Sequence, residues 1–139
     1  MNDFNEQIIA EFRANGGHVE TAGFGDNLVL LHTRGAKSGA EHVAPVMAFV
    51  DEDSWLVVAS KAGAPEHPAW YHNLRAEPRV SIEIPADGGI STMDVAASEL
   101  ESEARQAAWA NIVAAAPGFA DYEAKAVGRV IPVLRLTRR

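Results

Sequence analysis

The feature that most constrains the fold is a strict period-two alternation in residues 79–84, where every second side chain is apolar. Successive side chains of a β-strand point to opposite faces, so this pattern predicts a strand with one buried and one solvent-facing side. An Asp-Gly-Gly sequence at 87–89 follows and leads into a second β-prone run at 90–96. Because such sequences are typical of tight turns, the two runs predict an antiparallel hairpin. A fold made only of helices is thereby excluded.

Four further apolar, β-prone runs are separated by turns or helical segments, at residues 28–33, 43–50, 55–60 and 130–136. Most of the predicted strands are joined by hairpins, and the alternating strand–helix–strand units of a Rossmann sheet are absent. We therefore expect an α+β domain whose sheet curls into a barrel of about six mostly antiparallel strands with peripheral helices.

Four segments carry the spacing or the end signals of helices. Apolar residues recur on one face of residues 4–12, and Pro68 stands near the start of a short helix within residues 65–76. Ser98 and Glu101 have the spacing of a capping box, which predicts the start of a third helix. Pro117 begins a fourth helix with Phe119, Tyr122 and Ala126 on one face, and Gly128 is predicted to end it.

Composition limits the classes of function that the chain can have. Its 139 residues are the usual size of one domain, so we expect residues 1–139 to form a single domain. A formal charge of −7 disfavours nucleic acid, and the absence of cysteine excludes thiolate nucleophiles and thiolate metal centres. No apolar run approaches the roughly 18 residues of a membrane span. We expect a cytoplasmic location, with a peripheral contact of helix 4–12 at the inner membrane face left open.

Two loops carry most of the residues suited to an anionic ligand. In residues 34–40, glycines flank Lys37 and Ser38, so that backbone N–H groups, a cation and a hydroxyl can form an anion cradle. An ordinary polar hairpin tip is the alternative. Ala59-Ser60-Lys61-Ala62-Gly63 ends a predicted strand with another hydroxyl and another lysine. These loops hold two of the chain's three lysines, so together they would form one basic pocket in an acidic protein.

Two other segments offer aromatic or imidazole side chains. Trp70 and Tyr71 are adjacent on a predicted helix and point about 100° apart, so one should pack in the core while the other can face a flat heteroaromatic ligand. His32 and His42 are equally distant from Lys37, so a regular hairpin would place them opposite each other. Two histidines do not make a metal site, and we predict no metal.

These segments, in this order, resemble the deazaflavin-dependent nitroreductase family, split-barrel enzymes that use reduced coenzyme F420. The resemblance spans nearly the whole chain and extends to Asn15-Gly16-Gly17, Pro45, Pro78 and Ile131-Pro132-Val133. It implies an FMN-binding split-barrel-like fold and an oxidoreductase that transfers a hydride to an electrophilic acceptor, such as a quinone, an activated enone or a nitro compound.

The resemblance also implies the site residues. Those carried over as coenzyme-binding are Ala36, Lys37, Ser38, Gly39, Ala59, Ser60, Lys61, Ala69, Trp70 and Asn73. Among them, the 37–39 loop and Lys61 would hold the phosphate and glutamate tail, and Trp70 would lie near the deazaflavin ring. Tyr122 is implied as a proton donor over the substrate pocket, with Ser60 as the weaker candidate.

The chain departs from the family pattern at two positions in the loop region. Ala36 and His42 stand where the family usually carries basic residues. The departure keeps two alternatives open: an FMN-dependent split-barrel oxidoreductase, which needs fewer phosphate contacts, and a non-catalytic deazaflavin carrier. The sequence does not predict the oligomeric state.

Overall fold

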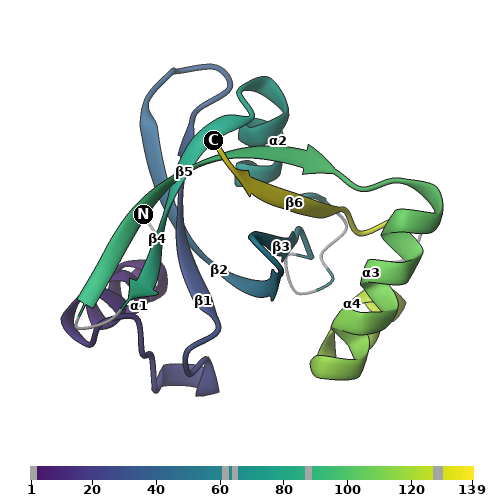
Figure 1. Cartoon of the computed structure of the whole chain (residues 1–139), viewed down its shortest axis with the longest axis horizontal. Helices are drawn as coiled ribbons and strands as arrows, with labels where there is room; N and C mark the ends of the chain where they lie inside the picture. The colour runs from purple at the N-terminus through teal and green to yellow at the C-terminus, as the bar shows by residue number, and fades with distance from the viewer. Residues whose placement is uncertain (1–2, 61–62, 64–65, 87–88, 127–129) are drawn as a thin grey trace.

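The computed structural model describes residues 3–60, 63, 66–86, 89–126 and 130–139, and its core is a closed six-stranded barrel (Figure 1). The strands are β1 (Leu28–Arg34), β2 (Glu41–Asp51), β3 (Ser54–Val58), β4 (Arg79–Ala86), β5 (Gly89–Glu99) and β6 (Val133–Arg138). They follow one another around the barrel as β1-β2-β3-β6-β5-β4, and every neighbouring pair is antiparallel. The predicted α+β barrel is confirmed.

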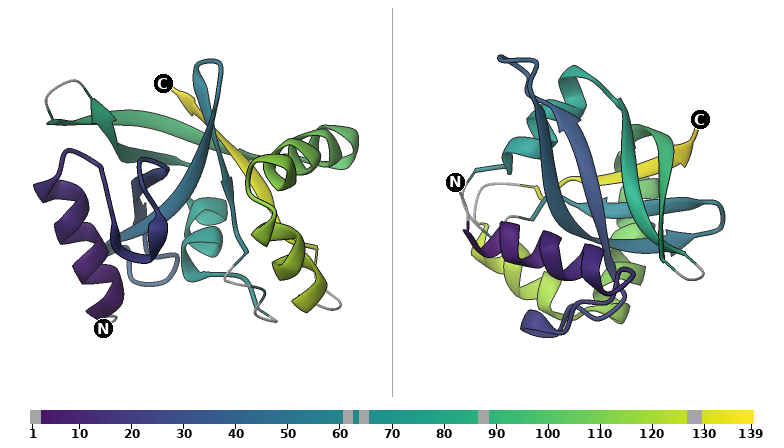
Figure 2. Two further views of the ribbon diagram at one scale, coloured as in Figure 1. Left: turned by 90° about the horizontal axis from the view of Figure 1, so that it is seen from below. Right: turned by 90° about the vertical axis from the view of Figure 1, so that its left-hand side faces the viewer.

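The helices cover different parts of this barrel, with α1 on one side and α3 and α4 on the other (Figures 1 and 2). They are α1 (Asp3–Ala14), the short 3-10 helix η1 (Thr21–Gly23), α2 (Ala69–Ala76), α3 (Ser102–Ala115) and α4 (Gly118–Lys125). In contrast, α2 contributes Tyr71 and Leu74 to the core inside the barrel. Across the described residues, no helix is long and apolar enough to span a membrane.

Strand β1 shows why part of the sequence is apolar without alternation. Val29 and Leu31 belong to the core inside the barrel. Leu28 and Leu30 face the opposite way and pack with α1 residues in a second cluster. A strand covered on both faces needs apolar residues at consecutive positions, so the uninterrupted run at 28–31 follows from its place under α1.

The predicted capping box is wrong. Strand β5 continues to Glu99, which pairs with Leu134 of β6, and α3 begins only at Ser102 with no side-chain cap bond from Glu101. The backbone N–H of Leu100 also donates to Val133 O at 2.9 Å. Long-range strand pairing therefore occupies the residues that local capping would have needed. Helix α4 matches the prediction from Pro117, whereas Gly128 lies outside the described residues.

The two histidines of the β1–β2 hairpin do not face each other. His32 pairs with Val43, and His42 pairs with Thr33, so the hairpin is centred between Lys37 and Ser38 rather than on Lys37. This shift places the two imidazoles on opposite faces of the sheet, since side-chain direction alternates along a strand.

An ion pair fastens the C-terminal end of α1 to the barrel. Arg13 donates from Nη2 to Oε2 of Glu83 at 2.7 Å and from Nε to Oε1 at 3.1 Å. His32 Nε2 lies 2.6 Å from the same Oε2. The hydrogen bond from Arg13, with a smaller contribution from His32, holds the pKa of Glu83 below its ordinary value of 4.5. Arg13 thereby stabilises the ionised form of this largely buried carboxylate.

Changing Glu83 to Gln is expected to lower the free energy of unfolding at pH 7 by about 1–2 kcal/mol, a range reduced because Arg13 is half exposed. A lowered folded-state pKa stabilises the fold above the unfolded-state value and loses that contribution as pH falls through the folded-state value. The variant should therefore lose less stability than the wild type between pH 5 and pH 3 in urea titrations. Glu52→Gln, in the exposed β2–β3 turn, is the control. Equal acid losses in Glu83→Gln and wild type would contradict this role.

Candidate active site

A groove of about 660 Å³ opens between the β1–β2 hairpin, α2 and α4. It is a suitable size for a small-molecule site. Five of the coenzyme-binding and catalytic residues implied by the sequence line it: Ser60, Ala69, Trp70, Asn73 and Tyr122. The structure thus brings together side chains that are more than sixty positions apart in the chain.

Helix α2 divides its two aromatic residues between the groove and the core. Trp70 is half-buried and lines the groove, whereas Tyr71 is only 4% exposed and packs inside the barrel. The Tyr71 hydroxyl donates to Glu99 Oε1 at 2.6 Å, and burial raises its pKa above the ordinary value of 10.0. The predicted core position is thereby confirmed for Tyr71, and the contact of Trp70 with a flat ligand stays a prediction.

Asn73 connects α2 to the β1–β2 hairpin. Its Oδ1 accepts a hydrogen bond from the backbone N–H of Ala36 at 3.0 Å, and its Nδ2 donates to Thr33 Oγ1 at 3.2 Å. The Asn73 side chain is buried, so these bonds are shielded from water. This amide therefore holds the hairpin loop in place beside the groove.

The hairpin loop uses most of its backbone donors internally. Gly35 N–H donates to Ala40 O at 2.8 Å, and Gly39 N–H donates to Gly35 O at 2.9 Å. Ala40 N–H donates to Ser38 Oγ at 3.1 Å. With Ala36 bonded to Asn73, the predicted cradle of successive free N–H groups is not formed by these four residues. Anion contacts from this loop are left to the exposed residues Lys37 and Ser38 at its tip.

Gly35 leaves space that a side chain would fill. A Cβ at this position would lie 2.6 Å from Ser38 Oγ and 3.1 Å from His42 Nε2. The Ser38 hydroxyl and the His42 imidazole therefore both lie close to Gly35. Lys37 is near them in the chain, and His42 also lines the groove. A hydroxyl, an imidazole and a lysine at one place form a donor set suited to an anionic group.

The segment after β3 supplies only part of what the sequence suggested. Ser60 lines the groove, but the side chain of Ala59 is fully buried in the barrel core, so it can reach a ligand only through its backbone. Lys61 lies outside the described residues. Gly63 has φ +82, and a Cβ there would lie 2.9 Å from Tyr122 O. This glycine allows α4 to pack directly against the segment that follows β3.

Helix α4 places Tyr122 at the groove. The Tyr122 ring is half-buried and meets Phe119 edge-on, with centroids 5.6 Å apart. Phe119 is buried and also contacts Phe49 of β2 at 5.9 Å. The two α4 side chains thus form one aromatic wall, as their shared helical face predicts.

Three lining residues, Asn5, Phe24 and Thr33, were not predicted from the sequence, and His42 was singled out there only as a departure from the family pattern and a possible partner of His32. Asn5 of α1 and Phe24, which follows η1, reach the groove from the N-terminal segment, and no local pattern marks them. Thr33 and His42 face it as a cross-strand pair. Strand β2 lines the groove with His42 and with residues 44–47, so alternation along the strand would not have identified them.

The groove fits a flat ring joined to an anionic tail. Trp70 and the aromatic wall of α4 supply flat apolar surface, and Ser60 supplies a hydroxyl. The donor set over Gly35, with exposed Lys37 nearby, suits the charged tail of such a ligand. For a metal, the described residues provide no cluster of three or more His, Asp or Glu side chains.

Comparisons with known proteins agree on one family. The profile of the F420H(2)-dependent quinone reductase family matches residues 5–138. An F420H(2)-dependent quinone reductase of Mycobacterium tuberculosis (strain H37Rv) is 37% identical over 113 residues, which cover 80% of this chain and 73% of that protein. A solved F420-H2 dependent reductase has a TM-score of 0.68 and 39% identity, covering 79% of this chain and 93% of its own.

A second solved structure, described as a domain-swapped dimer, has a TM-score of 0.70 and 36% identity and covers 94% of each chain. The predicted family resemblance, reductase activity and coenzyme F420 are confirmed at the level of the family, and the barrel is the fold of these relatives. The matches to F420H(2)-dependent reductases favour F420 over FMN as the cofactor, and a reductase over a non-catalytic carrier as the function. The match over almost the whole chain shows that this protein belongs to the F420H(2)-dependent quinone reductase family.

Proposed function

We propose that residues 1–139 act as one domain that oxidises reduced coenzyme F420 and reduces a quinone-type acceptor in the groove. The observation that carries the proposal is the convergence on one cavity of small-molecule size of half-buried Trp70, Tyr122 and the residues Thr33 and His42, which flank the loop that bears Lys37. When bound, reduced F420 supplies the hydride.

The coenzyme-binding residues have separate tasks in this proposal. Lys37 and Ser38 bind the anionic tail, with Gly39, at φ +72, shaping the turn that presents them. Lys61 is assigned the same task from the sequence resemblance alone. Trp70, Ala69 and Ser60 lie beside the ring, while Ala59 contributes backbone only. Ala36 and Asn73, also implied as coenzyme-binding by the resemblance, act by holding the loop against α2.

The chain's own chemical contribution is a proton. Reduction of a quinone to a quinol adds one hydride and one proton, so a donor must stand near the acceptor oxygen. Tyr122 is the donor in our proposal, because its ring is held by Phe119 while the residue lines the groove. Ser60 is the weaker candidate. A hydroxyl near the oxygen also stabilises the negative charge that develops there.

The apolar end of the groove suits a quinone better than a polar acceptor. Phe24, Met47 and Phe119 line it, so a planar carbonyl compound can bury its ring there. Enones and nitro compounds share the electrophilic character and are the alternative acceptors.

A cytoplasmic location, with α1 in contact with the inner face of a membrane, is a further part of the proposal. The observation that favours this contact is the exposure of Phe4, which is 47% exposed and stands next to Asn5, a residue that lines the groove.

The protein is expected to bind coenzyme F420 more tightly than FMN, because a long polyanionic tail uses more of the basic loop than one phosphate does. Parallel fluorescence titrations of the purified protein measure both dissociation constants. Oxidation of reduced F420 should then require an added quinone. Equal or tighter binding of FMN would favour the flavin alternative, and tight F420 binding without turnover on any quinone, enone or nitro compound would favour the carrier.

A further inference from the structure

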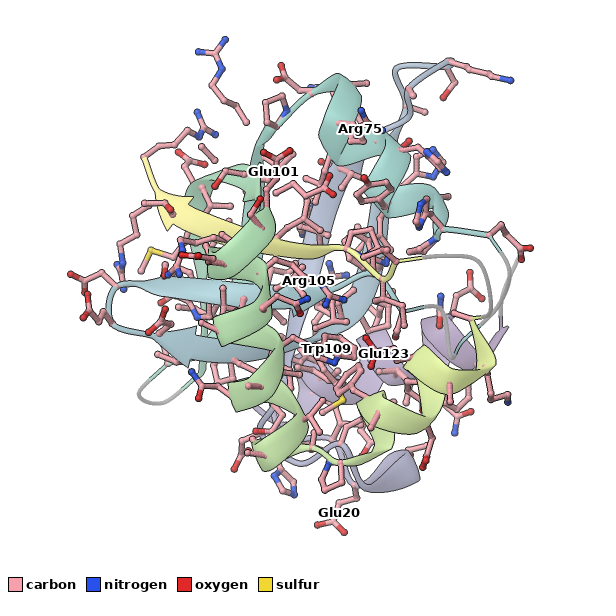
Figure 3. All side chains as sticks on the ribbon, turned by 90° about the vertical axis from the view of Figure 1, so that its right-hand side faces the viewer. Glu20, Arg75, Glu101, Arg105, Trp109 and Glu123 are labelled. Carbon is pink, nitrogen blue, oxygen red and sulfur yellow. The ribbon has the colours of Figure 1, made fainter. Side chains whose placement is uncertain are left out.

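Arg105 of α3 is a buried cation outside the groove. Its side chain is 10% exposed and lies between α3 and α4 together with Trp109 and Glu123 (Figure 3). Nη2 donates to Ile131 O at 2.8 Å, and Nη1 donates to Gln106 Oε1 at 3.1 Å. Among the described residues, Nε has no hydrogen-bond partner. Burying a guanidinium with an incomplete set of partners is unfavourable, so a specific contact must account for its presence.

The contacts of Arg105 lead directly to the aromatic wall. Its guanidinium stacks over the Trp109 ring at 4.6 Å. The Trp109 ring meets Phe119 of α4 at 6.5 Å, and Phe119 meets Tyr122 at 5.6 Å. Nη2 also lies 4.0 Å from Oε2 of Glu123, the residue after Tyr122. One side chain therefore touches α3, the backbone before β6 and α4.

Helix α4 depends on such contacts for its position. It has eight residues and no side-chain cap at its N-terminus. A helix this short is not stable by itself in water, so packing decides where it lies. On one side Gly63 lets the segment after β3 approach Tyr122, and on the other the α3 side chains Arg105 and Trp109 support it.

We propose that Arg105 is a positioning residue for quinone reduction: by fixing α4 against α3, it holds the Tyr122 hydroxyl and the Phe119 ring at the acceptor end of the groove. This inference rests on the proposed function, because it acts through Tyr122. Arg105 itself touches neither the coenzyme loop nor the groove, so its effect should be confined to the acceptor side.

The test compares Arg105→Met with Arg138→Met. Arg138 also lies over a tryptophan, Trp55 at 5.2 Å, but is exposed on β6, so it controls for the loss of a cation over a tryptophan outside α3 and α4. Arg105→Met should lower kcat with a soluble quinone about 10- to 100-fold, the range expected for a donor displaced by about 1 Å. Its dissociation constant for F420 should stay within about twofold of wild type. Amide exchange across residues 118–125 should be faster than in Arg138→Met, which should resemble wild type.

Arg105→Lys is the conservative variant and keeps a donor for the Ile131 carbonyl and a charge near Glu123. It should recover most of the lost turnover and of the amide protection of α4. If Arg105→Met fails to fold, Arg105→Gln, which keeps an N–H donor for the Ile131 carbonyl but loses the charge over Trp109, is compared with Arg138→Gln and should show the same losses in smaller measure. Turnover and exchange in Arg105→Met, or in Arg105→Gln where it replaces that variant, equal to those of the matching Arg138 variant would overturn the proposal.

A double variant separates positioning from general destabilisation. In a Tyr122→Phe background, Arg105→Met should lower kcat by no more than about twofold further, because the group that it positions is already gone. If Arg105→Met lowers kcat as strongly in the Tyr122→Phe background as it does alone, the inference is overturned. The proposed function fails separately if Tyr122→Phe alone keeps full turnover. In that case, faster α4 exchange with a raised KM for the quinone in Arg105→Met would still support a role through Phe119, and an unchanged KM would overturn it.

Discussion

Replacing Tyr122 with phenylalanine is expected to lower quinone-dependent turnover by about 10²–10⁴-fold, the usual contribution of a general acid. The ring of phenylalanine keeps the edge-on contact with Phe119, so the packing of α4 is preserved. Only the hydroxyl is lost, and Tyr122 lies on α4, whereas Lys37 and Ser38 lie on the β1–β2 loop. Affinity for F420 and the thermal midpoint should therefore stay close to wild type.

Steady-state oxidation of reduced F420 by a soluble quinone measures this effect. Tyr71→Phe is the matched control, because its hydroxyl bonds to Glu99 from the barrel core and does not line the groove. That control should keep its turnover despite some loss of stability. Wild-type turnover in Tyr122→Phe, with hydride transfer shown to be rate-limiting by a coenzyme isotope effect, would assign the proton to Ser60 or to water.

The second large effect is expected at Lys37, where substitution by alanine should weaken F420 binding roughly tenfold to a hundredfold. The lysine is exposed at the tip of a loop whose backbone donors are mostly used internally, so its charge is a major part of what the loop offers an anion. Because part of the attraction is screened by salt, the difference between variant and wild type should shrink at high ionic strength. Folding should be unaffected.

Fluorescence titration at low and high salt checks the Lys37 variant. Arg79→Ala removes an exposed cation from β4, outside the groove, and controls for the change in net charge. Lys61→Ala should behave like Lys37→Ala on the strength of the sequence resemblance. An F420 affinity unchanged in both lysine variants would make the β1–β2 loop an ordinary hairpin tip.

The local pattern of apolar residues was enough to predict the strands, because alternating or continuous apolar residues indicate whether one or both faces of a strand are buried. The order of the strands was not predictable in the same way. Strand β6 lies between β3 and β5, and this placement depends on pairing between distant segments such as Val58 with Val133. The same distant pairing extends β5 through Glu99 and defeats the local capping signal at Ser98.

In the candidate site, too, some features follow from local sequence and others depend on contacts between distant residues. Helical geometry alone separates Trp70 from Tyr71, because adjacent residues must point in different directions. The role of Asn73 could not be deduced, since its partner, the N–H of Ala36, is 37 positions away. The histidine register depended on a shift of half a residue in the hairpin centre, set by the hydrogen bond from Gly35 to Ala40.

Closure of the barrel has a consequence for how this chain avoids aggregation. Each of the six described strands has a hydrogen-bonded neighbour on both sides along part of its length, as β1 pairs with β2 over residues 28–34 and with β4 over residues 30–32. Open sheets guard their unpaired edges with lysines, prolines or bulges, whereas a closed sheet does not need them. Strands such as β1 can therefore be apolar at consecutive positions without becoming templates for intermolecular sheets.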